Sequence, residues 1–302
     1  MAKKIPSLTG IFAALPTPLG DDGAPDISAM DPIIEFLLDS GIRGFCVGGA
    51  TGEYAAYSIE QREQILRGVI ERVQGSAPVV AGAGAENAGQ VWRFAQAAAM
   101  RGAEAVLLPP PAFFPFDADT LGEIIANVTS KLPLPVLVYH IPQFTNDLGL
   151  DTILALIESS PNVVGLKDSS GNPENPSRIG RAKAQVPMIY LNGDDSLIVD
   201  AYQHGADGAI SGIASVCPEW AVVLDRSCRS GDSRRAVELQ RLGNELIAQL
   251  DTLPVPWGIH LALEVRGFHM ESLAWPVVSR LERPVAAFRE WFPGWLEKCL
   301  KA

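Results

Sequence analysis

The sequence lacks the marks of several common classes of protein. Its four cysteines form no Cys-x-x-Cys pair, which argues against a zinc site or a redox motif. Its 24 lysines and arginines, against 35 acidic residues, form no basic run, so binding to nucleic acid is not expected. No stretch approaches the run of about 18 apolar residues that spans a membrane, and no membrane association is expected. The composition therefore favours an acidic globular protein of net charge -11.

Cysteine and histidine indicate no further site. We expect small buried thiols at Cys46, Cys217, Cys228 and Cys299. No His-Glu-x-x-His or similar spacing connects the histidines, so neither a metal nor another cofactor is expected; they are His140, His204, His260 and His269. Because ligands distant in sequence can meet in a folded chain, a metal-dependent enzyme stays open as an alternative. Residues 1–6 lack the apolar run of a signal peptide, which predicts a cytoplasmic protein.

Short apolar runs predict a parallel β-sheet. They recur at intervals of roughly 30 residues, the length of one strand–helix–strand unit. Each is nearly continuous rather than alternating, which is typical of strands buried on both faces. The predicted strands are 10–14, 44–47, 78–81, 105–108, 135–139, 163–167, 188–191 and 208–211.

The segments between these runs have helical periodicity. A helix is expected from Ser58, which is followed three residues later by Gln61 as in a capping box, and others over 87–100 and 117–131. Repeated strand–helix–strand units give either an open doubly wound sheet or a closed barrel. Eight units favour the α/β class and a (β/α)8 TIM barrel, with the open sheet as the alternative.

The last part of the chain differs from the rest. After Ser215 the strand-like runs stop, and the remaining residues have a helical pattern interrupted by prolines. No linker rich in glycine, serine or charge separates the two parts. We therefore predict a barrel over residues 1–217, and over 218–302 the last barrel helix with a helical extension packed on the barrel.

Lys167 is the strongest candidate for a catalytic residue. It ends an apolar strand, and catalytic groups of such barrels lie at the carboxyl ends of strands. Burial disfavours the ammonium form, and an uncharged amine is a nucleophile. Two structural alternatives stay open, an ion pair with Asp168 and an outward-pointing lysine. Tyr139 ends the preceding strand and could relay a proton, although it could also be a rim tyrosine. Since neighbouring strand residues face opposite ways, His140 is given no role.

A glycine-rich turn over Gly48–Glu53 follows the second strand. Its backbone N–H groups, with the Thr51 hydroxyl, could hold a substrate carboxylate, or the turn could be only a tight connection. No Gly-Lys-Ser/Thr follows, and residues 82–87 lack the third glycine of a dinucleotide fingerprint, so nucleotide cofactors are not indicated.

In these motifs the chain resembles the pyruvate-dependent class I aldolases typified by dihydrodipicolinate synthase and N-acetylneuraminate lyase. The resemblance spans roughly residues 6–220. It rests on the turn 49–53, Tyr-His-Ile-Pro at 139–142, Gly-Leu-Lys-Asp at 165–168, Asn-Gly-Asp-Asp at 192–195 and Gly-Ala-Ile-Ser at 208–211. These motifs follow one another at the ends of five predicted strands, an order that is hard to produce by chance.

The resemblance implies a Schiff-base lyase, an aldolase or dehydratase acting on pyruvate or a 2-keto-3-deoxy sugar acid, and a homotetramer. Lys167 would be the nucleophile, Tyr139 the proton relay, and Thr51 a further catalytic group. The substrate would be held by Gly49, Ala50, Thr51, Ser169, Gly193 and Ile210. Alternatives are dihydrodipicolinate synthase itself and a non-catalytic protein that binds 2-oxo acids.

Three positions depart from the family pattern. Ala50 stands where members often carry a serine or threonine hydroxyl, and Phe113 and Phe114 stand where many supply a tyrosine across the subunit interface. Phe144 replaces the arginine with which dihydrodipicolinate synthases hold an aldehyde's carboxylate, which argues against that activity. Lys-Asp-Ser at 167–169 favours members acting on sugar acids, whereas a buried Phe113 or Phe144 would suit a less polar or aromatic aldehyde.

Overall fold

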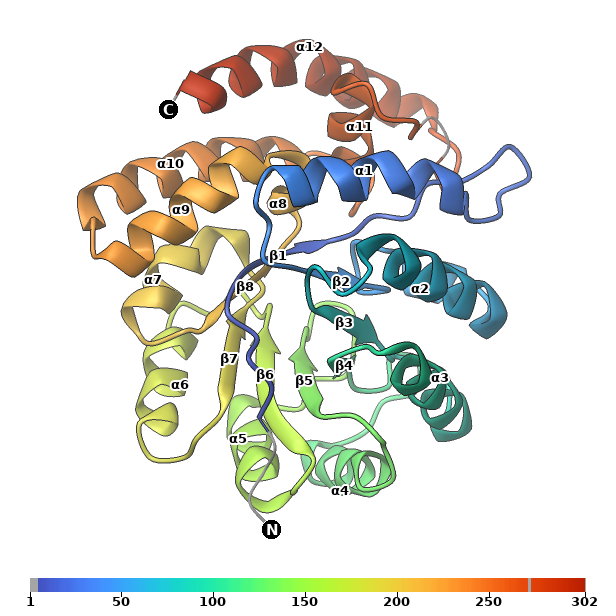
Figure 1. Ribbon diagram of the computed structural model, residues 1–302, viewed down its shortest axis with the longest axis vertical. Helices are drawn as coiled ribbons and strands as arrows, with labels where there is room; N and C mark the ends of the chain where they lie inside the picture. Colours follow the sequence, from blue (N-terminus) through green and yellow to red (C-terminus); the bar gives the residue numbers. More distant parts are fainter. Residues whose placement is uncertain (1–4, 271–272, 302) are drawn as a thin grey trace.

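The computed structural model describes residues 5–270 and 273–301 and contains a closed barrel of eight parallel strands (Figure 1). Each strand pairs with its neighbour in the sequence, and β1 pairs with β8 to close the sheet. The strands are β1 (Gly10–Ala14), β2 (Gly44–Val47), β3 (Val79–Gly82), β4 (Ala105–Leu108), β5 (Val136–His140), β6 (Val163–Asp168), β7 (Ile189–Asn192) and β8 (Gly208–Ser211). The predicted barrel is confirmed, and the open-sheet alternative is wrong.

Helices surround the barrel and continue beyond its last strand. They are α1 (Ile27–Asp39), α2 (Ile59–Val73), α3 (Ala88–Arg101), α4 (Ala118–Thr129), α5 (Leu150–Ser159), α6 (Asn175–Lys183), α7 (Ile198–Gln203), α8 (Ile213–Val216), α9 (Pro218–Ser230), α10 (Ser233–Leu250), α11 (Trp257–Val265), α12 (Ser279–Lys301), and the 3-10 helices η1 (Tyr54–Ala56) and η2 (Asp195–Leu197). Among the described residues, no helix is both long enough and apolar enough to cross a bilayer. Residues 1–4, part of the segment searched for a signal peptide, lie outside the described residues.

Local sequence signals start the helices where we predicted. Ser58 and Gln61 form the complete capping box of α2, and the side chain of Asn87 accepts a hydrogen bond from the Gln90 amide in the first turn of α3. Helix α4 ends at Thr129 rather than at residue 131, because the amide of Lys131 bonds to the carbonyl three residues earlier and tightens the last turn.

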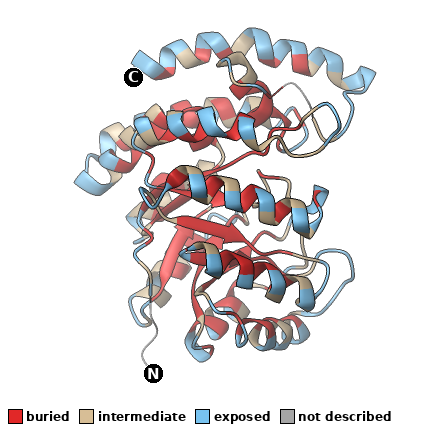
Figure 2. Ribbon diagram, turned by 45° about the vertical axis from the view of Figure 1, so that its right-hand side comes forward, coloured by how far each residue is buried: buried red, intermediate tan, exposed pale blue. Residues whose placement is uncertain are grey.

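The barrel walls separate two apolar cores. Side chains such as Phe12, Leu107 and Leu137 fill the interior, while the alternate strand residues pack against the surrounding helices. Figure 2 shows the strands buried throughout and the exposed residues on the outward sides of the helices. The middle of the barrel is therefore packed, and the carboxyl ends of the strands are left to form a site.

The part of the chain after β8 packs on the barrel as helices, as its pattern predicted. Helices α9 and α10 lie side by side above the barrel, and α12 forms the outermost layer (Figure 1). The indole N–H groups of Trp220 and Trp295 donate to the α10 carbonyls of Leu239, at 2.7 Å, and Leu242, at 3.0 Å. The division into domains at residues 217 and 218 stays a prediction.

The cysteines follow the prediction with one exception. Cys46, Cys217 and Cys299 are buried thiols. Cys228 is only half-buried, because it lies at the edge of the face that α9 turns toward the barrel.

Candidate active site

A cavity of about 350 Å³ opens at the carboxyl ends of the barrel strands. The structure brings most of the predicted site residues to its wall: Ala50, Thr51, Tyr139, Lys167, Ser169, Gly193 and Ile210. Gly49 belongs to the same turn but does not line the cavity. With Ala14 at the end of β1, residues from six strand ends and from the helices after β8 therefore converge on one site.

Lys167 and Tyr139 form a buried pair at the inner surface of the barrel. They are register partners on the adjacent strands β5 and β6, and each is 4% exposed. The Lys167 side-chain nitrogen donates a hydrogen bond to the Tyr139 hydroxyl oxygen at 3.1 Å, and it lies 4.2 Å from the centre of the Tyr139 ring. Among the described residues, no carboxylate lies within ion-pair distance of Lys167. The amine thus faces the cavity with a phenol as its neighbour.

The alternative ion pair between Lys167 and Asp168 is not formed. Asp168 points to the outer face of the sheet, where its Oδ1 lies 2.8 Å from Nδ1 of His140. Its carboxylate also accepts hydrogen bonds from the Ser170 amide and the Asn175 side chain, both at 3.2 Å. His140 reaches a second carboxylate, since its Nε2 lies 3.3 Å from Asp147.

The charges of this outer pair stabilise each other. Burial lowers the pKa of His140, but the hydrogen bond and charge of Asp168 outweigh that effect, and the pKa is raised. Burial is the largest single influence on Asp168 and raises its pKa, but the hydrogen bond and charge of His140 and the hydrogen bonds of Ser170 together outweigh it and lower the pKa below its ordinary value. Directly behind Lys167 and Tyr139, each member of this pair therefore favours the charged form of the other.

The glycine-rich turn presents unused backbone amides to the cavity. In the described part of the chain, the amides of Ala50 and Thr51 donate no hydrogen bond. The turn has no room to shift toward β3, because a Cβ on Gly82 would lie 1.9 Å from the Gly48 carbonyl oxygen. Gly48 itself has φ of 71°, which favours glycine. Rigid free amides of this kind can bind a carboxylate.

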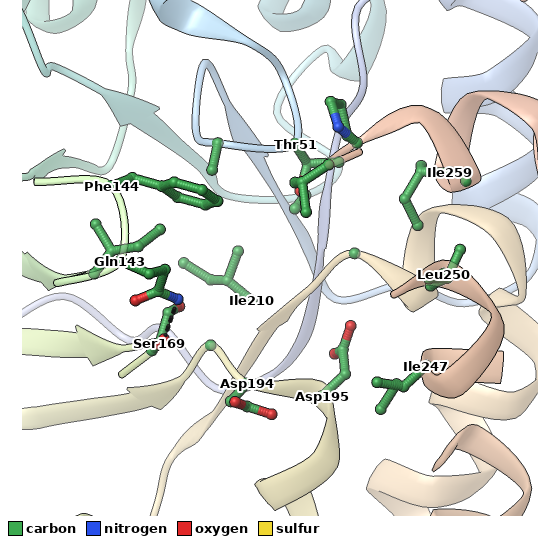
Figure 3. Close-up of a pocket in the computed structure, with 18 of the residues that line it drawn as sticks. Thr51, Gln143, Phe144, Ser169, Asp194, Asp195, Ile210, Ile247, Leu250 and Ile259 are labelled. Atoms are coloured by element: carbon green, nitrogen blue, oxygen red, sulfur yellow. Dashed lines mark hydrogen bonds between the residues drawn. The ribbon is translucent and has the colours of Figure 1, made fainter. Parts of the chain in front are cut away.

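Asp195 is a site residue to which the sequence analysis gave no role. Its partly buried carboxylate points into the cavity below Thr51 and Ile210 (Figure 3). One carboxylate oxygen accepts the Ile213 amide at 3.1 Å, and burial raises the pKa to about 6. The motif Asn-Gly-Asp-Asp marked this position, but the burial depends on helices distant in sequence.

One wall of the cavity comes from the helices after β8, and the sequence analysis missed it. Ile247 and Leu250 on α10 and Ile259 on α11 face the cavity from one side (Figure 3). Their spacing gave no signal, because apolar residues of amphipathic helices usually pack in a core. The same segment reaches the turn, since Nε2 of the buried His260 lies 3.3 Å from the Glu53 carboxylate.

The expectation of a buried Phe113 or Phe144 is wrong. Phe113 is 80% exposed, lies outside the cavity, and packs edge-on against Phe114 at 5.0 Å between ring centres. Phe144 is 52% exposed but lines the mouth of the cavity. The loops after β4 and β5 project these rings beyond the barrel, so in the single chain only Phe144 can touch a bound molecule.

Metal binding has no visible basis in the described ranges. Within residues 5–270 and 273–301, no group of three or more histidine, cysteine, aspartate or glutamate side chains could hold a metal ion. The chemically active groups of the cavity are instead an amine, a phenol, a carboxylate and free amides. Such a set can hold an anion beside a nucleophile.

Comparison with known proteins gives one consistent result. The model of the dihydrodipicolinate synthetase family matches residues 7–287. A 4-hydroxy-tetrahydrodipicolinate synthase from Bartonella bacilliformis is 31% identical over 272 residues, which cover 90% of this chain and 92% of the relative.

Solved structures agree with this match. Dihydrodipicolinate synthase from Aquifex aeolicus has a TM-score of 0.87 and 27% identity, with 95% of this chain and 98% of that chain covered. YagE, a prophage protein of the dihydrodipicolinic acid synthase family from E. coli K12, was solved in complex with pyruvate. It has a TM-score of 0.88 and 25% identity, with the same coverage of 95% and 98%.

Proposed function

This chain belongs to the dihydrodipicolinate synthetase family, an enzyme family of class I lyases, and we propose that it is a Schiff-base lyase acting on pyruvate or a larger 2-oxo acid. The proposal rests mainly on one observation. A buried lysine that has no carboxylate partner among the described residues donates to a buried tyrosine at 3.1 Å, beside a turn whose amides are free within the same residues.

Lys167 supplies the nucleophile. Its uncharged amine attacks the ketone carbon, and loss of water gives a protonated imine that joins Lys167 to the substrate. The imine nitrogen then accepts the electron pair released when C3 loses a proton or when the C3–C4 bond breaks. In the second case the C4 hydroxyl gives up its proton, and the fragment that carries C4 leaves as an aldehyde. The product of that step is an enamine, which takes up a proton at C3 before water releases the 2-oxo acid and the free amine.

Tyr139 and the turn serve the same steps. The Tyr139 hydroxyl receives the hydrogen bond of the amine, so it can accept and return the protons that the addition and the loss of water require. The amides of Ala50 and Thr51 hold the carboxylate next to the ketone, with the Thr51 hydroxyl as a further donor. Ser169, Gly193 and Ile210 line the space around the bound acid.

Borohydride trapping tests this function. We expect protein incubated with pyruvate and borohydride to gain one reduced pyruvate adduct, located at Lys167 by peptide mass spectrometry. Lys167→Ala should form none, while Lys298→Ala, which removes an exposed lysine of α12, should trap as the unchanged protein does. Lack of an adduct under conditions that label an active relative would contradict the proposal.

Two further expectations belong to this proposal. The family resemblance predicts a homotetramer, and sedimentation analysis of the purified chain measures its mass directly. We also propose a cytoplasmic location. A non-catalytic 2-oxo acid binding protein would raise its melting temperature with pyruvate yet convert no member of a panel of aldehydes and sugar acids.

A further inference from the structure

The charged side chains that line the cavity are mostly acidic. Among its described lining residues, Lys167 is the one cation, whereas Asp194, Asp195 and Asp251 are acidic. Lys167 becomes part of the imine, and the substrate's own carboxylate occupies the free amides of the turn. A second anionic group, on the aldehyde that joins or leaves the enamine, would meet carboxylates and no counter-charge. Because an unpaired charge in a partly buried site is costly, the cavity disfavours a charged aldehyde.

The space beyond Lys167 is also apolar on two sides. Ile247, Leu250 and Ile259 form one wall, and Phe144 lies across from them at the mouth (Figure 3). An apolar substituent placed between these side chains would remove apolar surface from water on both partners. This wall belongs to α10 and α11, whereas the imine forms at the end of β6, so we place the substituent of the aldehyde against the wall.

Several polar groups near the aldehyde end are already bonded within the protein. Asp194 accepts from both the amide and the hydroxyl of Ser196, the latter at 2.6 Å, and the Gln143 side-chain amide donates to the Ser169 carbonyl at 2.8 Å. A chain of substrate hydroxyls would have to compete with these bonds. The buried Ser169 hydroxyl has no hydrogen-bond partner among the described residues, but with Asp194 and Gln143 already bonded the site offers a polyhydroxylated partner fewer free groups than its count of polar residues suggests.

We propose that the aldehyde partner is uncharged and carries an apolar aryl or branched alkyl substituent. This inference rests on the proposed Schiff-base function and names its substrate class. In the synthetic direction, C3 of the enamine forms a bond to the aldehyde carbon, and the aldehyde oxygen takes a proton. Water then cleaves the imine, releasing a 4-hydroxy-2-oxo acid with one carboxylate and the free Lys167 amine. Cleavage runs through the same steps in reverse.

A matched set of aldehydes tests the proposal. We expect the whole purified chain, saturated with pyruvate, to use benzaldehyde with kcat/KM about 100-fold above that for 4-carboxybenzaldehyde, since the two differ only in one unpaired charge. Glyceraldehyde, a small polyhydroxylated aldehyde, should also fall at least about 10-fold below benzaldehyde. A preference for either competitor, or equal use of benzaldehyde and its carboxylated form, would overturn the proposal.

Substitutions at the wall should change this preference in a defined direction. Phe144→Arg places a cation at the mouth and should raise kcat/KM for 4-carboxybenzaldehyde about 10-fold relative to benzaldehyde. Val237→Arg adds the same charge on the exposed face of α10, outside the cavity, and should leave the ratio unchanged. If both variants shift the ratio equally, the effect comes from net charge and the proposed wall is wrong.

Failure of this inference is distinguishable from failure of the proposed function. Borohydride trapping of pyruvate is measured first, because it needs Lys167 but no aldehyde. Absence of the adduct removes the proposed function itself. An adduct together with preferred use of the carboxylated or polyhydroxylated aldehyde leaves the Schiff-base function standing and removes only the apolar partner.

Discussion

The inner and outer faces of β5 and β6 carry two pairs of neighbouring residues with opposite surroundings. Inside the barrel, Lys167 and Tyr139 share one hydrogen bond and face a cavity. Outside it, His140 and Asp168, the next residues along the same strands, sit in a network that also includes Asn175. The inner pair is left open to a reactant, while the outer pair is held on several sides.

This difference shows how the ends of two strands can be held together by a carboxylate without pairing that carboxylate with the reactive amine. The outer bond joins the carboxyl ends of β5 and β6, and the amide of Ser169 donates to the His140 carbonyl at 2.8 Å to continue the ladder. Because side chains alternate across the sheet, these bonds position the inner pair while Asp168 stays out of reach of Lys167. A carboxylate on the inner face would instead hold the amine as an ammonium ion.

Removal of the Tyr139 hydroxyl, which breaks the inner pair, should have the largest effect on activity of the substitutions considered. Tyr139→Phe keeps the ring over Lys167 but takes away its hydroxyl, so kcat should fall by about 10²- to 10⁴-fold, as for loss of a general acid–base group. KM for the 2-oxo acid should change little, because the carboxylate is held by the turn. Steady-state kinetics beside the borohydride assay measure both, and a kcat within threefold of the unchanged protein would contradict the proposed relay.

Substitution of His140 should show that the outer pair acts on the inner one. His140→Leu leaves Asp168 as a buried charge without its main partner and should cost about 3–5 kcal/mol of stability. We expect kcat to fall about 10-fold as the strand ends lose their alignment. His140→Asn, which retains a side-chain N–H donor, should restore most of both.

The control for this prediction is to compare the melting temperature of His140→Leu with its kcat per folded molecule. A purely structural role for His140 would lower the melting temperature of His140→Leu while leaving kcat per folded molecule unchanged. That result, measured at a temperature well below the melting transition, would separate the two faces and contradict the coupling.

The smallest expected effect is the pH dependence of the free energy of unfolding that the outer pair produces. His140 has a raised pKa in the folded protein, so its contribution is complete below the ordinary pKa of about 6.5 and is lost as the pH rises through the raised value. Asp168 has a lowered pKa, so its contribution is present above about 3.8 and is lost as the pH falls below that.

Urea unfolding between pH 5 and 9 measures the alkaline part of this dependence. The unfolding free energy of the unchanged protein should fall relative to that of His140→Asn as the pH rises above about 6.5. Parallel curves for the two proteins would show that His140 is uncharged in the folded state throughout this range.

Sequence patterns predicted the barrel and the reactive residues because both depend on local features. Eight apolar runs fix the number of strands, and the alternation of side chains places Tyr139 inside when His140 is outside. The partner of His140 was not predictable, since it depends on the register of two strands. The exposure of Phe113 was also missed, because the path of a loop is not encoded in periodicity.

The contribution of the last helices to the cavity was beyond the sequence for a different reason. Ile247 and Ile259 have the pattern of core residues, and only the packing of α10 and α11 against the barrel mouth turns them toward a ligand. The raised pKa of Asp195 has the same origin, since burial depends on what covers the residue.

The contact between His260 and Glu53 joins α11 to the turn after β2. We assign these two stretches of chain to the binding of different parts of the substrate. Under the proposed function, strand ends of the barrel bind the keto acid, and α10 and α11 together with Phe144 contact its aldehyde partner. Recombination between relatives within the loop that precedes α10 should therefore change the preference for the aldehyde and leave the preference for the keto acid unchanged. A chimera that keeps the contact between His260 and Glu53 would be the starting point for engineering variants that accept new combinations of keto acid and aldehyde.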